Sequence, residues 1–176
     1  IPTFGHDTIR RFERNVSSLS RMAARDYEDI LESCIPPFEG LFPSNHESHI
    51  LNLLYLLAYW HSLGKLRLHV NVTVRIIDHV TTELGKALRY FADVICPDYN
   101  TFETEKEYSA RKRTEARRPS VTPGSAPTTS RVGRQPKVFT LQAIKLHYLG
   151  DAAETIEKFG SLESVSTKTV SLPSSF

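Results

Sequence analysis

Histidines are the residues of this chain best suited to bind a metal or move a proton, and two of them are close in sequence. His46 and His49 lie three residues apart, a spacing that places both on one face of a helix. No cysteine pair or Glu-x-x-His pair supplies the remaining ligands of a zinc site, and the dipeptide His6-Asp7 lacks recognisable partners. An enzyme with a histidine metal site is therefore the least favoured of three hypotheses, and we expect no metal and no other cofactor.

A second polar cluster follows the apolar run 50–60 and has two interpretations. His61, Lys65, Arg67 and His69 either form a recognition patch for a partner or serve the fold itself. In the second case the imidazoles form hydrogen bonds within the helices, and the two cations lie at a helix C-terminus, where the helix dipole stabilises them. Both interpretations remain open from the sequence.

The rest of the sequence contains no recognisable catalytic centre. Carboxylates are scattered on helix faces, and no glycine-rich phosphate loop, GxSxG elbow or HExxH motif occurs. Cys34 and Cys96 are isolated from each other and form no CxxC pair, which favours two buried free thiols. We therefore predict that the chain is not an enzyme and has no catalytic residues.

Positive charge is concentrated between residues 105 and 137, although the net charge of +2 is small. From Pro119 to Pro136 the chain consists mainly of Pro, Ser, Thr and Gly with interspersed arginines, a composition that predicts disorder. This basic stretch predicts weak, sequence-independent and salt-dependent DNA binding, and a solvated tether without a ligand is the alternative. The candidate phosphate contacts are Arg111, Lys112, Arg113, Arg117, Arg118, Arg131 and Arg134.

The elements that position these groups are predicted to be helices. Apolar residues at intervals of three and four predict helices near residues 6–34, 44–68 and 71–95. No segment alternates apolar and polar residues with period two. The predicted fold is therefore all-α: an antiparallel helical bundle with a disordered basic Pro/Ser/Thr-rich insert and a short C-terminal helical segment.

Local signals set the expected ends of these helices. Pro36-Pro37 should end the first helix, and Ser44 with Glu47 should form a capping box at the start of the second. Near the C-terminus, Asp151 with Glu154 predicts another helix start, and Gly160 predicts its end.

The chain is thereby divided into five parts. We expect a helical bundle over 1–101, a basic charged helix over 102–118, a disordered linker over 119–136, a short helical segment over 137–160 and a loose tail over 161–176. The predicted core consists of Leu54, Leu57, Trp60, Ile77, Leu84, Leu88 and Phe91.

Several blocks of the sequence carry a family resemblance. They are 22–31 (MAARDYEDIL), 35–43 (IPPFEGLFP), 60–69 (WHSLGKLRLH) and 145–151 (KLHYLGD), with Phe159-Gly160 and Ser166-Thr167 after them. Over most of its length the chain resembles the C-terminal part of transposon-encoded, transposase-associated proteins of fungi, of the Plavaka and KDZ kind. In that group the Ser-Thr pair precedes a Glu-Leu-Glu-His-like stretch, whereas here Lys168-Thr169 follows.

The resemblance implies a DDE-type transposase whose catalytic acids lie largely outside this segment. Because the chain begins with Ile1 rather than Met, we expect it to be a piece of a longer reading frame. The first hypothesis is a non-catalytic accessory region of a partial or degenerate transposon-derived protein, with DNA or a missing transposase core as partner. The second is a stand-alone helical protein–protein interaction module. Neither a secretory leader nor a membrane span is expected, and the predicted location is intracellular, nuclear if the origin is transposon-related.

Overall fold

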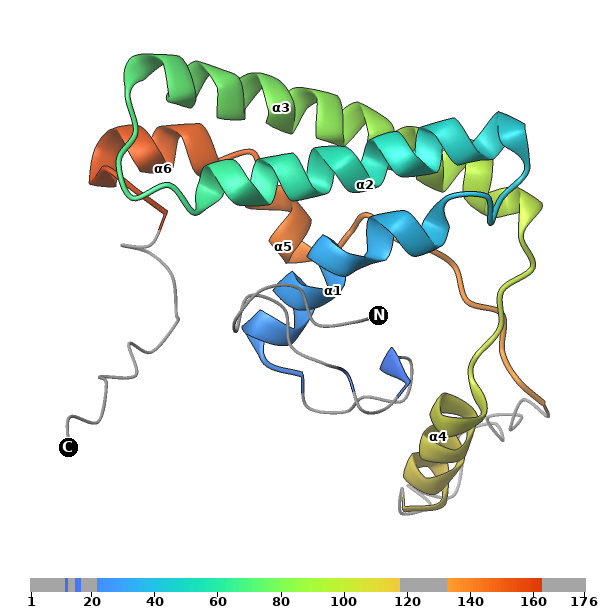
Figure 1. Cartoon of the computed structure of the whole chain (residues 1–176). Helices are drawn as coiled ribbons and strands as arrows, with labels where there is room; N and C mark the ends of the chain where they lie inside the picture. The colour runs from blue at the N-terminus through green and yellow to red at the C-terminus, as the bar shows by residue number, and fades with distance from the viewer. Residues whose placement is uncertain (1–11, 13–14, 17–21, 118–132, 163–176) are drawn as a thin grey trace. The chain divides into compact units, whose positions relative to one another are not determined.

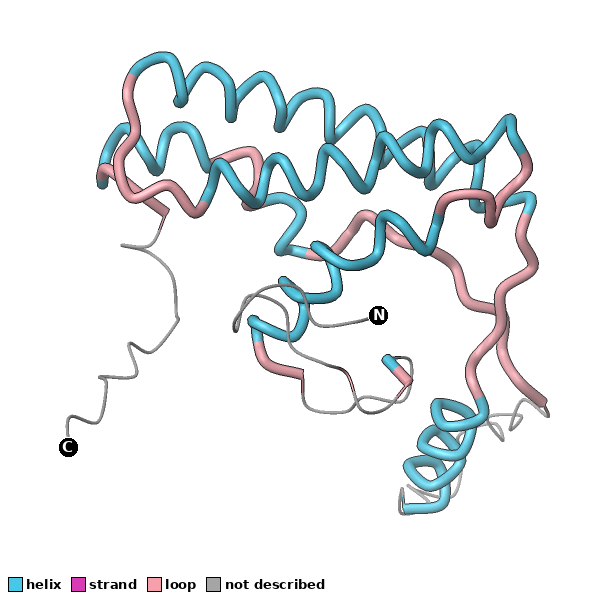
Figure 2. The backbone as a smooth tube through the Cα atoms, viewed as in Figure 1, coloured by secondary structure: helices cyan, strands magenta, loops and turns pink. Residues whose placement is uncertain are grey.

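The computed structural model describes residue 12 and residues 15–16, 22–117 and 133–162, and its regular elements are helices (Figure 1). Among these residues no β-strand forms (Figure 2), and one isolated antiparallel bridge pairs Phe102 with Pro136. The predicted all-α class is confirmed. No helix of the described part is long and apolar enough to cross a membrane.

The chain forms two compact units. The core unit comprises Ile1–Phe91 and Leu141–Phe176, and the insert unit comprises Ala92–Thr140. The sequence placed the boundary at residue 101 and treated the C-terminal segment as separate from the bundle. The structure instead assigns that segment to the core unit, because its apolar residues are buried against the other helices.

The core unit is built around two long helices. The helices α2 and α3 run side by side in opposite directions, and the short loop after Gly64 joins them (Figure 1). The helix α1 packs against α2, and α6 packs against α3. The bounds are α1 Ala24–Phe38, α2 Ser44–Gly64, α3 Asn71–Tyr90, α5 Ile144–His147 and α6 Ala152–Phe159.

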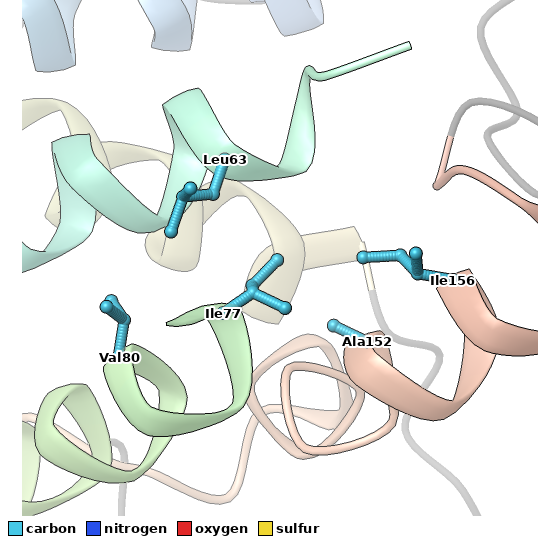
Figure 3. Close-up of a cluster of buried hydrophobic side chains, with 5 residues drawn as sticks. All are labelled: Leu63, Ile77, Val80, Ala152 and Ile156. Atoms are coloured by element: carbon cyan, nitrogen blue, oxygen red, sulfur yellow. The ribbon is translucent and has the colours of Figure 1, made fainter. Parts of the chain in front are cut away.

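Two clusters of buried side chains form the core of this unit. The first brings α6 onto α3, with Ala152 and Ile156 directed toward Ile77 (Figure 3). Its buried members are Leu63, Ile77, Val80, Ala152 and Ile156. The second consists of Leu53, Leu84 and Leu88. Burial of each large apolar side chain contributes about 1.5–3 kcal/mol to folding, so these clusters account for most of the packing that holds α2, α3 and α6 together.

Trp60 lies against both clusters and is half-buried rather than central. Its indole Nε1–H donates a hydrogen bond of 2.8 Å to Thr81 Oγ1, and that hydroxyl donates one of 2.7 Å to the Ile77 carbonyl. The polar edge of the indole is thereby satisfied inside an apolar environment, which fixes α2 against α3.

The predicted core is confirmed for α3 and only partly for α2. Ile77, Leu84 and Leu88 are buried as expected. Half-buried positions are occupied by Leu57, Trp60 and Phe91, which pack against the second cluster, and by Leu54, which belongs to neither cluster. The apolar residues of α2 cover nearly its whole circumference, so the sequence did not show which face meets a partner.

The first helix differs from its prediction at both ends. Met22 and Ala23 are not helical and α1 begins at Ala24, whereas most of the predicted segment before Met22 lies outside the described residues. The prediction that Pro36-Pro37 ends this helix is wrong, because both prolines lie within its last turn. The helix continues to Phe38, where the Glu39 N–H donates 3.2 Å to the Pro36 carbonyl.

The second helix begins at Ser44, as predicted, but its capping and its end differ from the prediction. The expected capping box of Ser44 and Glu47 is wrong: Pro43 occupies the N-cap position, and the Glu47 carboxylate accepts a hydrogen bond from the Gly40 N–H instead. Gly40 has a φ of 75°, which lets the chain reverse between α1 and α2. The helix ends at Gly64, before the predicted residue 68.

The third helix matches its predicted start and changes form near its end. At the start, Thr73 Oγ1 accepts the Val70 N–H at 2.9 Å. The predicted helix 71–95 is α-helical through Tyr90 and π-helical over Phe91–Ile95, and a 3₁₀ turn, Cys96–Asp98, follows it. The proline in that turn explains the stop, as the sequence predicted.

The C-terminal segment forms two short helices. The predicted helix start is confirmed, because Asp151 is the N-cap residue of α6. The predicted side-chain capping is wrong, because Asp151 makes no side-chain cap and Glu154 pairs with Lys158. The predicted stop is confirmed: Gly160 has a φ of 84°, and its N–H donates 2.8 Å to the Ile156 carbonyl. Of the predicted tail, residues 161–162 are described, and Leu162 packs against the first cluster.

Candidate nucleic-acid interface

The insert unit contains the helix α4, Glu105–Arg117, which carries most of the candidate phosphate contacts. A capping box that the sequence analysis missed starts this helix. Glu107 Oε2 accepts hydrogen bonds from the Thr104 N–H at 2.9 Å and from its Oγ1 at 3.0 Å, and Thr104 Oγ1 accepts the Glu107 N–H at 3.3 Å. The Thr104 backbone bond, with the Lys137 ammonium 2.9 Å from Oε1, lowers the pKa of Glu107 to about 2.

Glu103 is the centre of a charged network that precedes this helix. It is buried, with 8% of its surface exposed, and its two oxygens accept a forked pair of bonds from Arg111. Nε lies 2.9 Å from Oε1, and Nη2 lies 3.0 Å from Oε2. The Arg111 bonds, with a backbone bond from Gln135, hold the pKa of Glu103 below its ordinary value. Two parallel charge-assisted hydrogen bonds of this kind are stronger than bonds between neutral groups and fix the relative orientation of the two side chains.

The same network connects the segment before α4 to the segment after the basic stretch. The Glu103 N–H donates 2.8 Å to the Gln135 carbonyl, and the Gln135 N–H donates 3.0 Å to Glu103 Oε2. The Lys137 N–H donates 2.8 Å to the Thr101 carbonyl, and Thr101 Oγ1 donates 2.7 Å to the Lys137 carbonyl. Residues 133–136, part of the stretch predicted to be disordered, therefore have a defined conformation, and residues 119–132 of that prediction lie outside the described part.

Three of the candidate phosphate contacts are already paired with carboxylates. In addition to Glu103, Arg111 binds Glu115 through Nη1 at 3.0 Å. Lys112 lies 3.8 Å from Glu115, and Arg134 lies 3.8 Å from Glu105. Both Arg111 and Lys112 also lie over the Tyr108 ring, with 5.4 and 5.9 Å to its centroid. These cations are neutralised within the insert unit.

Arg113 and Arg117 differ from the other described candidates. Both are exposed, and neither forms an ion pair with any residue that the structure describes. Four residues apart, they lie on one face of α4, at about 160° and about 120° around the helix axis from Arg111. This face is called the basic stripe below and consists of Arg113 and Arg117. The candidates Arg118 and Arg131 lie outside the described residues.

The proposed recognition patch of the core unit is divided by its contacts. Lys65 Nζ lies 3.1 Å from Glu28 Oε2, and His61 Nε2 lies 3.8 Å from Glu28 Oε1, so both residues connect α2 to α1. His69 Nδ1 lies 3.3 Å from Thr73 Oγ1, and Arg67 is exposed. The four side chains share no common contact, and both interpretations of this cluster stay predictions.

The two histidines with metal-ligand spacing lie in different environments. His46 is buried, whereas His49 is exposed with its ring centroid 4.4 Å from that of Tyr90. His6 and Asp7 lie outside the described residues. In the part of the chain that is described, no group of three or more His, Cys, Asp or Glu side chains is arranged to hold a metal ion.

The two cysteines are free thiols, as predicted, but neither is fully buried as expected. Cys34 and Cys96 are half-buried, and burial raises the pKa of each thiol. A thiol with a raised pKa is a poor nucleophile at neutral pH, so neither cysteine has the environment of a reactive residue.

Sequence analysis missed Glu103, and no local signal identifies it. It lies eight residues before Arg111, a spacing that no helical rule favours, and its other partner follows only after the basic stretch. No protein-family model matches this chain, and neither a curated protein nor a solved structure matches it. The transposon resemblance therefore depends on the sequence blocks alone and stays a prediction.

Proposed function

We propose that this chain is a non-catalytic helical accessory region of a partial or degenerate transposon-derived protein that contacts the DNA backbone through its insert unit. The observation that carries the proposal is the basic stripe. Its two guanidinium groups are exposed on one helix face and lack carboxylate partners among the described residues. The transposon resemblance supports DNA as the polyanion and the nucleus as the compartment.

The proposal narrows the set of phosphate contacts. Arg111, Lys112 and Arg134 have carboxylate partners, and removing a cation from such a partner costs part of the energy gained at a phosphate. Arg113 and Arg117 can contact a phosphate without giving up a carboxylate partner among the described residues. Arg118 directly follows Arg117 in the sequence. Contacts of this type position a protein on DNA without reading its sequence.

The test is a titration of short labelled duplexes of unrelated sequence at several salt concentrations. We expect similar affinity for all duplexes and a logarithm of the binding constant that falls by about 0.9 per neutralised phosphate for each tenfold rise in salt. The variant Arg113→Ser/Arg117→Ser should bind more weakly, and its slope should be smaller by about 1.8, the value expected for the loss of two phosphate contacts.

A matched control removes the same charge elsewhere. Arg75 and Arg89 are exposed on α3 of the core unit, so Arg75→Ser/Arg89→Ser changes net charge equally and leaves the basic stripe intact. Its salt slope should equal that of the wild type. Absence of binding at low salt, or equal slopes for the two double variants, contradicts the proposal.

The second candidate function is a protein–protein interaction module, and one observation favours it. Tyr55 and Tyr59 of α2 are 59% and 37% exposed, and their rings stack with centroids 6.0 Å apart. Paired exposed tyrosines are typical of interface anchors. A partner captured by the wild type and lost with Tyr55→Ser/Tyr59→Ser, in a protein that does not bind duplexes, would favour this function over DNA binding.

A further inference from the structure

Arg111 uses four of its five N–H donors within the insert unit. Its Nε binds Glu103, its Nη1 binds Glu115, and its Nη2 binds both Glu103 and the Gly133 carbonyl at 2.8 Å. Its side chain is 22% exposed, against 10% for that of Glu103. Only one Nη1–H is left, so Arg111 cannot form a bidentate bond to a phosphate without breaking this mostly buried network.

The hydrogen-bond partners of Arg111 lie at both ends of the segment 102–136. Glu103 precedes α4, whereas Gly133 follows the basic stretch, and the neighbouring backbone of Thr101 pairs with that of Lys137. The segment 102–136 thus leaves and returns at nearly the same place within the insert unit. Few apolar contacts are available there, since Ile95 and Glu103 are the buried residues among those described.

We propose that Glu103 and Arg111 form a clamp that closes residues 102–136 into a loop with fixed ends and positions the basic stripe of α4 for the phosphate backbone. Arg111 and Glu103 are positioning residues in this arrangement and touch no ligand. The second half of the proposal rests on the proposed function, whereas the closure of the loop does not depend on it.

The closure is tested by the exchange rates of single backbone amides measured by NMR. In Glu103→Gln, which keeps the shape and removes the charge, the amides of Glu103, Gln135 and Lys137 should exchange about tenfold faster or more, because exchange reports local opening. Glu115→Gln is the matched control: it also removes one carboxylate bound to Arg111, at an exposed site, and leaves the fork to Glu103 intact. Its exchange rates should stay near those of the wild type.

A second variant separates geometry from charge. Arg111→Lys keeps the positive charge but cannot form the fork. The same amides should therefore exchange almost as fast in this variant as in Glu103→Gln. In both variants the amide of Leu84, in the core unit, should keep its protection and show that the protein remains folded. Equal exchange in Glu103→Gln and Glu115→Gln, or full protection in Arg111→Lys, overturns the clamp.

Duplex titrations of the same variants test the positioning role. We expect Arg111→Lys to weaken duplex binding severalfold at unchanged net charge, and Arg113→Ser/Arg117→Ser to lower the salt slope with unchanged amide exchange. Unaltered affinity in Arg111→Lys overturns positioning and leaves closure to be judged by exchange. A wild type that binds no duplex defeats the proposed function and the positioning role together, and the exchange experiment still decides whether the loop is closed.

Discussion

Different interactions stabilise the core unit and the insert unit. In the core unit, α2, α3 and α6 are joined by buried aliphatic side chains, and Ile77 and Leu84 are 0% and 1% exposed. In the described part of the insert unit, the conformation depends on carboxylates that pair with cations and backbone N–H groups. The two units should therefore respond to different perturbations: the core unit to lost volume, and the insert unit to lost charge.

The largest expected effect comes from a cavity in the core unit. Leu84→Ala removes a side chain that is 1% exposed and should lower the free energy of unfolding by about 2–5 kcal/mol. Urea unfolding followed by circular dichroism measures this loss. Leu54→Ala, at a half-buried position outside both clusters, is the control and should cost clearly less. A loss below about 0.5 kcal/mol for Leu84→Ala would be at odds with the buried cluster.

A somewhat smaller loss should identify α6 as part of the same core. Ile156 is 2% exposed and meets Ile77 in the first cluster (Figure 3). Ile156→Ala should cost about 2–4 kcal/mol in the same unfolding experiment, because the short helix relaxes more easily around a cavity than α3 does. Phe159→Ala, at an exposed residue of α6, should change stability little. Similar losses for both variants would place α6 outside the core.

Acid should affect the insert unit through two carboxylates. The pKa of Glu107 is lowered to about 2 from 4.5, and that of Glu103 is lowered as well. A lowered pKa means that the stabilisation is complete above pH 4.5 and is lost as the pH falls toward 2. NMR titration of the side-chain carboxyl carbons should show Glu107 titrating near pH 2, and Lys137→Gln should move its midpoint toward 4.5. A wild-type midpoint at 4.5 would refute the capping network.

The smallest effect on the stability of the core unit is expected from the largest change in the sequence. Replacing residues 102–136 by an Asn-Gly turn between Thr101 and Lys137, whose backbones already pair, should leave the unfolding midpoint of the core unit almost unchanged. Thermal unfolding of the shortened chain, compared with the full chain, measures this. Loss of cooperative unfolding in the shortened chain would show that the core unit depends on the insert.

The sequence predicted α3 well because its two faces differ. Ile77, Leu84 and Leu88 fall at helical intervals opposite charged residues, so spacing alone identified the buried face. The same rule failed on α2, where apolar residues surround the helix, and it missed Ile156, whose burial depends on a helix far away in the sequence. Helical pattern reports the face of one helix and not the identity of its partner.

Composition predicted where the candidate phosphate contacts lie in the sequence, and the contacts in the structure show which of them are already bound to carboxylates. The arginines between Arg111 and Arg134 were correctly recognised as a concentration of charge, but composition cannot tell a paired guanidinium from an unpaired one. Arg111 and Arg113 are two residues apart, and only one of them forms a fork with a carboxylate. That distinction depends on Glu103 and on the return of the chain at Gln135.

The pairing of Thr101 with Lys137 has a consequence for how this protein can change over evolutionary time. Because the ends of the segment are held together by groups outside the stretch between Arg117 and Gly133, that stretch can gain or lose residues without altering either end. Doubling the length of a loop costs only about 0.6 kcal/mol in closure entropy. We therefore expect the fold to tolerate insertions at this position, and a tag or a foreign peptide to be introduced there at small cost in stability.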